Sequence, residues 1–294
     1  MLTLIVFIPL VAALALLFVS RDDSGTIRNV SIGAAGLTFL ISLVLLSKFD
    51  SSVQGMQFIE THAWVPMFHI NYRLGVDGIS LWLVVLTTFI SLIAVCFSLD
   101  RDVGFRNFMA LLLALEAGTL GVFVALDMIL FYVFWELMLI PTYFLIGIWG
   151  EGDRIYATTK FVLYTLVGSL FMLLGIIWLS LIHFEATHEF SFDIQVLSHM
   201  KIDPATQVWL FLFFLSAFAI KIPIFPLHSW LPHTYISSPI PVLLLLTGAM
   251  SKAGAYGIIR FCLPLFPDAV DYFGLAIAFG AAAGIFYGAW IAIA

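Results

Sequence analysis

The stretch that decides the fold runs Ala217-Phe-Ala-Ile-Lys-Ile-Pro-Ile-Phe-Pro-Leu-His-Ser-Trp-Leu-Pro-His233. It overlaps the end of an apolar run, Val208 to Ile220, that is otherwise typical of a membrane helix. Lys221 ends that run, and Pro223 and Pro226 follow it. A charge in an apolar interior costs free energy, and proline frees backbone carbonyls that lipid cannot satisfy. The stretch therefore predicts a broken helix, with Lys221 as the centre of an ion path that protein or buried water must surround.

The composition places this chain among membrane proteins. Of its 294 residues, 63% are hydrophobic and only 10% are charged, whereas soluble domains carry about 25% charged residues. Apolar runs near the length of a membrane helix recur and predict an all-α, polytopic transmembrane helix bundle of about nine spans. We expect these spans at about 2–20, 30–47, 79–98, 107–125, 128–149, 158–182, 207–227, 240–262 and 270–294. The lipid bilayer is then the surrounding partner, and no nucleic-acid motif is present.

The basic residues predict how the bundle is oriented, because positive charge in short links favours the cytoplasmic side. The links after spans one, three and five hold Arg21, Arg28, Arg101, Arg106, Arg154 and Lys160, and the opposite links hold Lys48, Arg73, Lys201 and Arg260. This bias places the N-terminus outside, which is the periplasmic side of a bacterial inner membrane. The last span ends at Ala294 without a polar flank, so we expect a fragment of a longer chain.

The candidate site residues are four ionisable residues that fall well inside the apolar spans: Glu116, Glu136, Lys221 and Lys252. Each charge costs roughly 2.5–3.5 kcal/mol at the membrane centre on insertion scales. We therefore expect these side chains to face the bundle interior, to pair, or to stay neutral. Pro141 frees a backbone carbonyl next to Glu136, as Pro223 does near Lys221, so both positions can be hydrated.

Two interpretations stay open for these charges. A buried Glu–Lys pair either relays protons or only locks helix packing, and both readings remain for Glu116, which lies near Gly118 and Gly121. His228 either passes protons at physiological pH or is ordinary polarity at a helix end. The seven histidines form no metal-binding pattern, and no phosphate loop, CxxC, haem-attachment or nucleophile motif occurs. Neither a metal nor a cofactor is therefore expected on this chain.

Five motifs resemble the antiporter-like subunits of respiratory complex I, and the subunit M (chain 4) group above all. They are Leu74-Gly-Val-Asp-Gly-Ile-Ser-Leu81, Phe134-Trp-Glu-Leu-Met-Leu-Ile-Pro141, Ala157-Thr-Thr-Lys-Phe161, Pro226-Leu-His-Ser-Trp-Leu-Pro232 and Lys252-Ala-Gly-Ala-Tyr-Gly-Ile-Ile-Arg-Phe261. Leu263-Pro-Leu-Phe-Pro-Asp268 adds to the similarity. The motifs are long, keep their order and cover most of the chain from about residue 70, so the resemblance is specific.

The resemblance implies a domain layout. The family fold has fourteen transmembrane helices built from two inverted five-helix repeats, each with a broken helix. This chain would hold an N-terminal three-helix segment at 1–106 and the first antiporter-like five-helix repeat at 107–262. Residues 263–294 would begin a further transmembrane helix, and the rest of the second repeat would be missing.

The resemblance also implies a function. By motif, Glu136 matches the glutamate that pairs with the broken-helix lysine, here Lys221, and Lys252 matches the lysine that links the two half-channels. Glu116 and His228 would support this proton relay. The implied protein is a proton-translocating membrane subunit of NADH–quinone oxidoreductase, which moves protons through buried water beside the other membrane subunits of complex I. Quinone reduction elsewhere in the complex would drive it, and this chain would carry no electrons.

One part of the chain departs from the family pattern. After Trp-Leu-Pro the family usually continues with Asp-Ala-His, then Glu or Gln, Ala and Pro, whereas this chain has His233-Thr-Tyr-Ile-Ser-Ser-Pro239. An acid, one histidine and the following polar residue are lost, which alters the expected route of proton entry. Two other functions therefore stay open: a subunit of a multisubunit Na⁺/H⁺ antiporter, or a non-pumping membrane scaffold that is a degenerate or truncated paralogue.

Overall fold

The computed structural model describes residues 1–101 and 103–293. Within this part, eight helices are long and apolar enough to cross a membrane, which confirms the predicted all-α polytopic bundle. They are α2 (Ser24–Lys48), α3 (Gly78–Phe97), α4 (Phe105–Val124), α5 (Met128–Trp149), α6 (Arg154–Thr187), α8 (Pro204–Lys221), α13 (Pro267–Ile293) and the composite span Ile240–Leu265. The ninth expected span is the shorter α1 (Leu2–Leu16), of 15 residues. At 1.5 Å per residue it rises about 22 Å, less than the roughly 30 Å of hydrocarbon in a bilayer.

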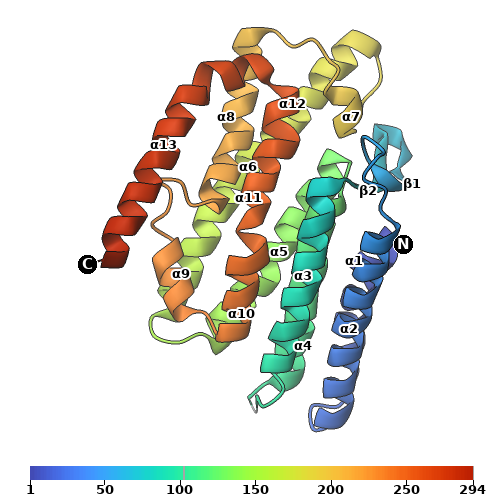
Figure 1. Cartoon of the computed structure of the whole chain (residues 1–294), viewed down its shortest axis with the longest axis vertical. Helices are drawn as coiled ribbons and strands as arrows, with labels where there is room; N and C mark the ends of the chain where they lie inside the picture. Colours follow the sequence, from blue (N-terminus) through green and yellow to red (C-terminus); the bar gives the residue numbers. More distant parts are fainter. Residues whose placement is uncertain (102, 294) are drawn as a thin grey trace.

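Helix α4 is the centre of the N-terminal half of the bundle. Nearly all of its side chains are buried, because α1, α3 and α5 pack around it. In the other half, α6 packs along α8, and α13 contacts α8 from outside. Figure 1 shows α13 at one edge of the bundle and α1 and α2 at the opposite edge. The helices that carry the candidate charges lie between these edges.

Aspartate side chains begin most of the helices that follow a polar link. Each carboxylate accepts hydrogen bonds from backbone N–H groups in the first turn, which a helix cannot satisfy internally. The capping residues are Asp23 for α2, Asp77 for α3, Asp127 for α5, Asp193 for the short helix α7 (Ile194–Leu197) and Asp203 for α8. These caps fix where each helix enters the apolar layer.

A β-hairpin joins α2 to α3, in a link for which no strands were predicted. Strand β1 (Gln57–Val65) pairs antiparallel with β2 (Ile70–Val76). The backbone N–H of Leu126, in the turn between α4 and α5, donates to the carbonyl of Arg73 at 2.9 Å. The carboxylate of Asp127 in the same turn accepts from the Asn71 N–H at 3.0 Å. The hairpin therefore covers one end of the bundle and ties its central helices together.

The composite span is an α-helix interrupted by two π-helical turns, where a plain helix was expected. It consists of α10 (Ile240–Leu245), the π turn η2 (Leu246–Met250), α11 (Lys252–Gly257), the π turn η3 (Ile258–Cys262) and α12 (Leu263–Leu265). At η2 the Ser251 N–H donates to the carbonyl of Leu246 at 2.9 Å and bypasses Thr247, its α-helical partner. The Thr247 carbonyl instead accepts from the Ser251 hydroxyl at 2.8 Å and from Lys252 Nζ at 2.9 Å. The π turn thus opens a polar point in an apolar helix.

Candidate functional site

The predicted helix break is present and lies at the predicted place. Helix α8 ends at Lys221, and the chain resumes helical structure at α9 (Leu231–Ser237). The carbonyl of Ala219, which Pro223 deprives of its usual donor, accepts from the Ile224 N–H at 2.9 Å. The carbonyl of Ile220 accepts from the indole Nε1–H of the buried Trp230 at 2.9 Å. Protein donors therefore satisfy two of the carbonyls at the break, as a membrane interior requires.

The Lys221 ammonium lies between aromatic rings at this break. The side chain is only 3% exposed, and its Nζ lies 5.4 Å from the centre of the Trp135 ring and 5.6 Å from that of Phe161. Such rings attract a cation through their electron-rich faces and stabilise it by about 2 kcal/mol when water is excluded. Aromatic faces thus contribute to holding the charge at the end of α8.

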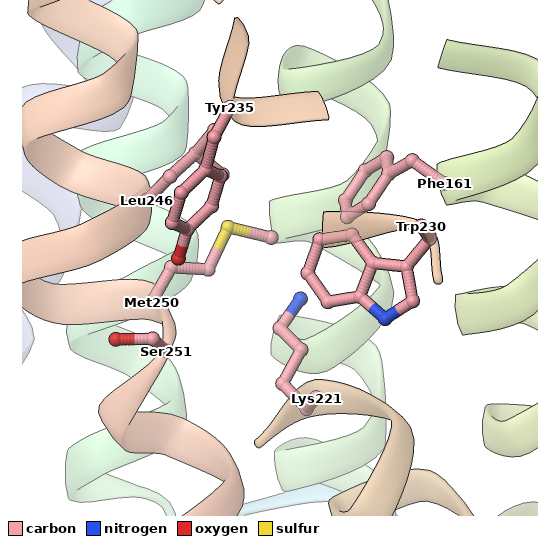
Figure 2. Close-up of a pocket in the computed structure, with 7 residues that line it drawn as sticks. All are labelled: Phe161, Lys221, Trp230, Tyr235, Leu246, Met250 and Ser251. Carbon is pink, nitrogen blue, oxygen red and sulfur yellow. The ribbon is translucent and has the colours of Figure 1, made fainter. Parts of the chain in front are cut away.

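A small cavity adjoins the Lys221 side chain, which points into it (Figure 2). Its volume is about 10 Å³, which is room for about one water molecule. Residues from three parts of the chain line it: α6, the break with α9, and the composite span. They are Phe161, Lys221, Trp230, Tyr235, Leu246, Met250 and Ser251. Most of the surface of this lining is apolar, so few polar atoms face Lys221 across the cavity.

Glu136 lies beside this site without forming the expected ion pair. It follows Trp135 on α5, and its Oε1 is buried with no hydrogen-bond partner among the described residues. Its charge acts on Lys221, but within the described part of the chain no ion pair joins the two side chains. The Trp135 ring that contacts Lys221 also packs against Phe218 on α8, with ring centres 5.6 Å apart. The structure therefore brings the two charges near each other but keeps them separate.

Lys252 is exposed, so of the three possibilities expected from the sequence (facing the bundle interior, pairing or staying neutral) the first does not hold for it. Its neighbours Ala253, Gly254 and Tyr256 are buried, and α11 turns them toward α8 and α4. Lys252 projects from the face that these helices leave uncovered, and its charge is stabilised locally instead. Besides the Thr247 carbonyl, its Nζ hydrogen-bonds the Ser251 hydroxyl at 3.3 Å. Since Ser251 also lines the cavity, Lys252 is connected to the Lys221 site through one residue.

Glu116 and His228 are not among the residues that line the cavity. Glu116 is fully buried in α4, and neither carboxylate oxygen has a hydrogen-bond partner among the described residues. The Nδ1 atom of His228 is likewise buried without a described partner. The imidazole stacks on Phe225, with ring centres 5.4 Å apart, and contacts Tyr287 of α13 edge-on at 5.0 Å. The structure therefore groups His228 with α13.

Sequence reasoning missed three polar or aromatic contributors to the site: Trp230, Tyr235 and Ser251. Trp230 was part of a quoted motif, but only the structure shows its hydrogen bond across the break. For Tyr235 the one sequence signal was its place in the segment that departs from the family pattern. No sequence pattern indicated Ser251, because the π turn beside it cannot be recognised from residue composition. Among the described residues, no three His, Cys, Asp or Glu side chains are placed to hold a metal ion.

Comparison with known proteins supports the resemblance noted in the sequence. A family model described as "NADH:quinone oxidoreductase/Mrp antiporter, TM" matches residues 125–294. The NADH-quinone oxidoreductase subunit M of Rhodobacter capsulatus is 39% identical over 308 residues, which cover 100% of this chain and 59% of that protein. The resemblance to the subunit M group is thereby confirmed. The chain spans little more than half the length of such relatives.

Solved structures give the same result for the fold. A chain of respiratory complex I from Thermus thermophilus with bound NADH matches with a TM-score of 0.86 at 30% identity, over 99% of this chain and 59% of that one. A chain of the Mrp complex from Dietzia sp. DQ12-45-1b matches with a TM-score of 0.73 at 22% identity, over 91% and 29%. The second match concerns the fold alone. With its membrane bundle and broken helix, the chain therefore belongs to the NADH:quinone oxidoreductase/Mrp antiporter family of transmembrane proteins.

Proposed function

We propose that this chain is a proton-translocating membrane subunit of an NADH–quinone oxidoreductase. The observation that carries the proposal is Lys221: a buried cation at a helix break, beside a cavity of about 10 Å³ and within the field of Glu136. Ionisable groups inside membranes are costly and are retained where ions or protons move. The family to which the chain belongs supports the same conclusion.

The relay works through the balance of forces on Lys221. Burial disfavours the ammonium, whereas the negative charge of Glu136 and the faces of two aromatic rings favour it. When Glu136 is neutralised or moves away, the ammonium loses part of its stabilisation and releases a proton into the cavity. Quinone reduction elsewhere in the complex supplies the energy that changes this balance. On the far side of Ser251, Lys252 accepts the proton when its side chain is the neutral amine, while Glu116 and His228 support the relay from outside the cavity.

The partners follow from the same proposal. The other membrane subunits of the oxidoreductase pack against the chain, lipid surrounds the remaining surface, and buried water carries protons between side chains. Residues 1–106 form an N-terminal segment, 107–262 the first repeat, and 263–294 the start of the next helix. The membrane is a bacterial inner membrane with the N-terminus in the periplasm, because arginines gather in the links of the opposite side.

The test is proton movement by the assembled oxidoreductase in sealed vesicles, with NADH as the electron donor. Lys221→Ala should lower the number of protons moved per electron, while electron transfer to quinone continues. Lys201→Ala is the control, because Lys201 lies in an exposed link and should leave the ratio unchanged. A normal ratio in the Lys221 variant overturns the proposal and favours a non-pumping scaffold.

A Na⁺/H⁺ antiporter subunit is the second candidate. The matching family model also covers Mrp antiporters, and the fold is like that of a chain of an Mrp complex. The two functions differ in their need for sodium. Proton movement that continues when choline replaces sodium supports the oxidoreductase, and movement that stops without sodium supports the antiporter.

A further inference from the structure

Two polar groups face the Lys221 cavity besides Lys221 itself. Tyr235 enters from α9, and Ser251 lies at the junction of η2 and α11. Figure 2 shows the Tyr235 hydroxyl on the Met250 and Ser251 side of the cavity, while Lys221 points into the same space from the end of α8. The Trp230 indole, the other polar ring, already donates to the Ile220 carbonyl. The phenol of Tyr235 therefore shares one cavity with the Lys221 cation and with Ser251 of the composite span.

The Tyr235 hydroxyl lacks the fixed partner that two other tyrosine hydroxyls in the bundle have. The hydroxyl of Tyr164 bonds Ser229 Oγ at 2.8 Å, and that of Tyr256 donates to the Phe123 carbonyl at 3.1 Å. Among the described residues, the Tyr235 hydroxyl has no such fixed partner, although its ring is half-buried. The cavity that Tyr235 lines has room for about one water. A water there can hydrogen-bond a hydroxyl that no protein group holds.

The route continues from Tyr235 to the exposed lysine. Ser251 Oγ donates to the Thr247 carbonyl at 2.8 Å and accepts from Lys252 Nζ at 3.3 Å. The π turn η2 removes the Ser251 N–H from the Thr247 carbonyl, which accepts from the Ser251 hydroxyl and from Lys252 Nζ instead. Ser251 therefore has one side at the cavity and the other at Lys252.

We propose that the Tyr235 hydroxyl carries the proton between Lys221 and the Ser251–Lys252 edge, which rests on the proposed function above. As the phenol oxygen accepts a proton from the Lys221 ammonium, directly or through one water, its own O–H bond breaks and that proton passes to Ser251 Oγ. The Ser251 hydroxyl gives up its original proton to the lone pair of the Lys252 amine, which accepts it only in its neutral form. Lys221 ends as an amine, Lys252 as an ammonium, and both hydroxyls end neutral. Tyr235 occupies the position where the family pattern has a histidine, another side chain that can accept and release a proton.

Tyr235→Phe is the sharpest test, because it removes one oxygen and keeps the ring. In assembled oxidoreductase in sealed vesicles, we expect protons moved per electron to fall to the level of Lys221→Ala. Tyr235→His should restore the ratio, because imidazole can carry a proton, whereas a purely structural ring would not discriminate in this way. Tyr143→Phe is the control, since Tyr143 is 42% exposed on α5 and should pump normally.

The outcomes separate this inference from the proposed function. A normal ratio in Tyr235→Phe, together with a loss in Lys221→Ala, overturns the role of Tyr235 alone. Normal ratios in both variants overturn the proposed function as well. If Tyr235→Phe does not assemble, Ser251→Ala interrupts the same route one step later. It should then lower the ratio in the same way, and a normal ratio in that variant contradicts the route.

Discussion

The hydrogen bond that closes the helix break gives a prediction whose size follows from the structure. Trp230 is 4% exposed, and its Nε1–H is the donor to the Ile220 carbonyl at 2.9 Å. Trp230→Phe leaves that carbonyl without a partner, which costs about 1–3 kcal/mol. The smaller ring also loses packing against Phe161, now at 5.2 Å between ring centres, worth on the order of 1 kcal/mol. The break should therefore open more easily by about 2–4 kcal/mol.

Hydrogen exchange measures this opening, because buried amides exchange through local unfolding. A cost of about 2 kcal/mol corresponds to exchange that is roughly thirtyfold faster, at 1.4 kcal/mol per factor of ten. We expect this acceleration in residues 219–231 of the assembled protein, measured by mass spectrometry. Trp209→Phe is the matched control, because Trp209 is on α8, the helix that ends at the break, and is 58% exposed. Equal exchange in the two variants would refute the reasoning.

Two further predictions concern the contacts that hold the composite span. Burial opposes ionisation of Asp77, but its hydrogen bonds and the charge of Arg260, whose guanidinium donates at 2.7 Å, lower its pKa overall. The ionised Asp77 therefore stabilises the folded state above about pH 4, and this stabilisation is lost below it. Asp77→Asn should lower the free energy of unfolding by about 1–3 kcal/mol near neutral pH. The melting temperature of the variant should also fall less steeply as the pH is lowered. A Cβ at Gly254 would lie 2.9 Å from the Phe218 carbonyl oxygen, so Gly254→Val should cost at least about 1–3 kcal/mol in thermal unfolding. Gly284→Val should not lower the stability in this way, because no described atom lies within 4 Å of a Cβ at that position. An equal loss of stability in the two glycine variants would contradict close packing against α8.

The bundle and the break could be predicted from sequence because each leaves a local pattern. Apolar runs mark the spans, and a lysine followed by Pro223 and Pro226 marks a helix end. The hairpin between α2 and α3 left no such pattern. Its first strand is mostly exposed, and hydrogen bonds to the distant turn between α4 and α5 anchor it. Long-range anchoring of this kind cannot be read from a short window of sequence.

The site itself was predicted in its parts but not in its geometry. Burial of Glu116 and Lys221 followed from the cost of exposing a charge to lipid. The exposure of Lys252 did not follow from the sequence, because packing against α8 and α4 determines which face of α11 is covered. The separation of Glu136 from Lys221 did not follow from the sequence either, because the packing of α5 against the end of α8 sets it. The π turn at Ser251 escaped prediction because π and α turns use the same residue types.

The central claim is that Glu136 and Lys221 act together on one proton-transfer step. The most direct measurement is the proton-to-electron ratio of Glu136→Gln, Lys221→Ala and the double variant, each normalised to the amount of assembled oxidoreductase. We expect the same reduced ratio in all three variants, because the second substitution removes nothing that the first has left working. A normal proton-to-electron ratio in Glu136→Gln would contradict this shared role. A double variant whose loss equals the sum of two separate single-variant losses would contradict it as well.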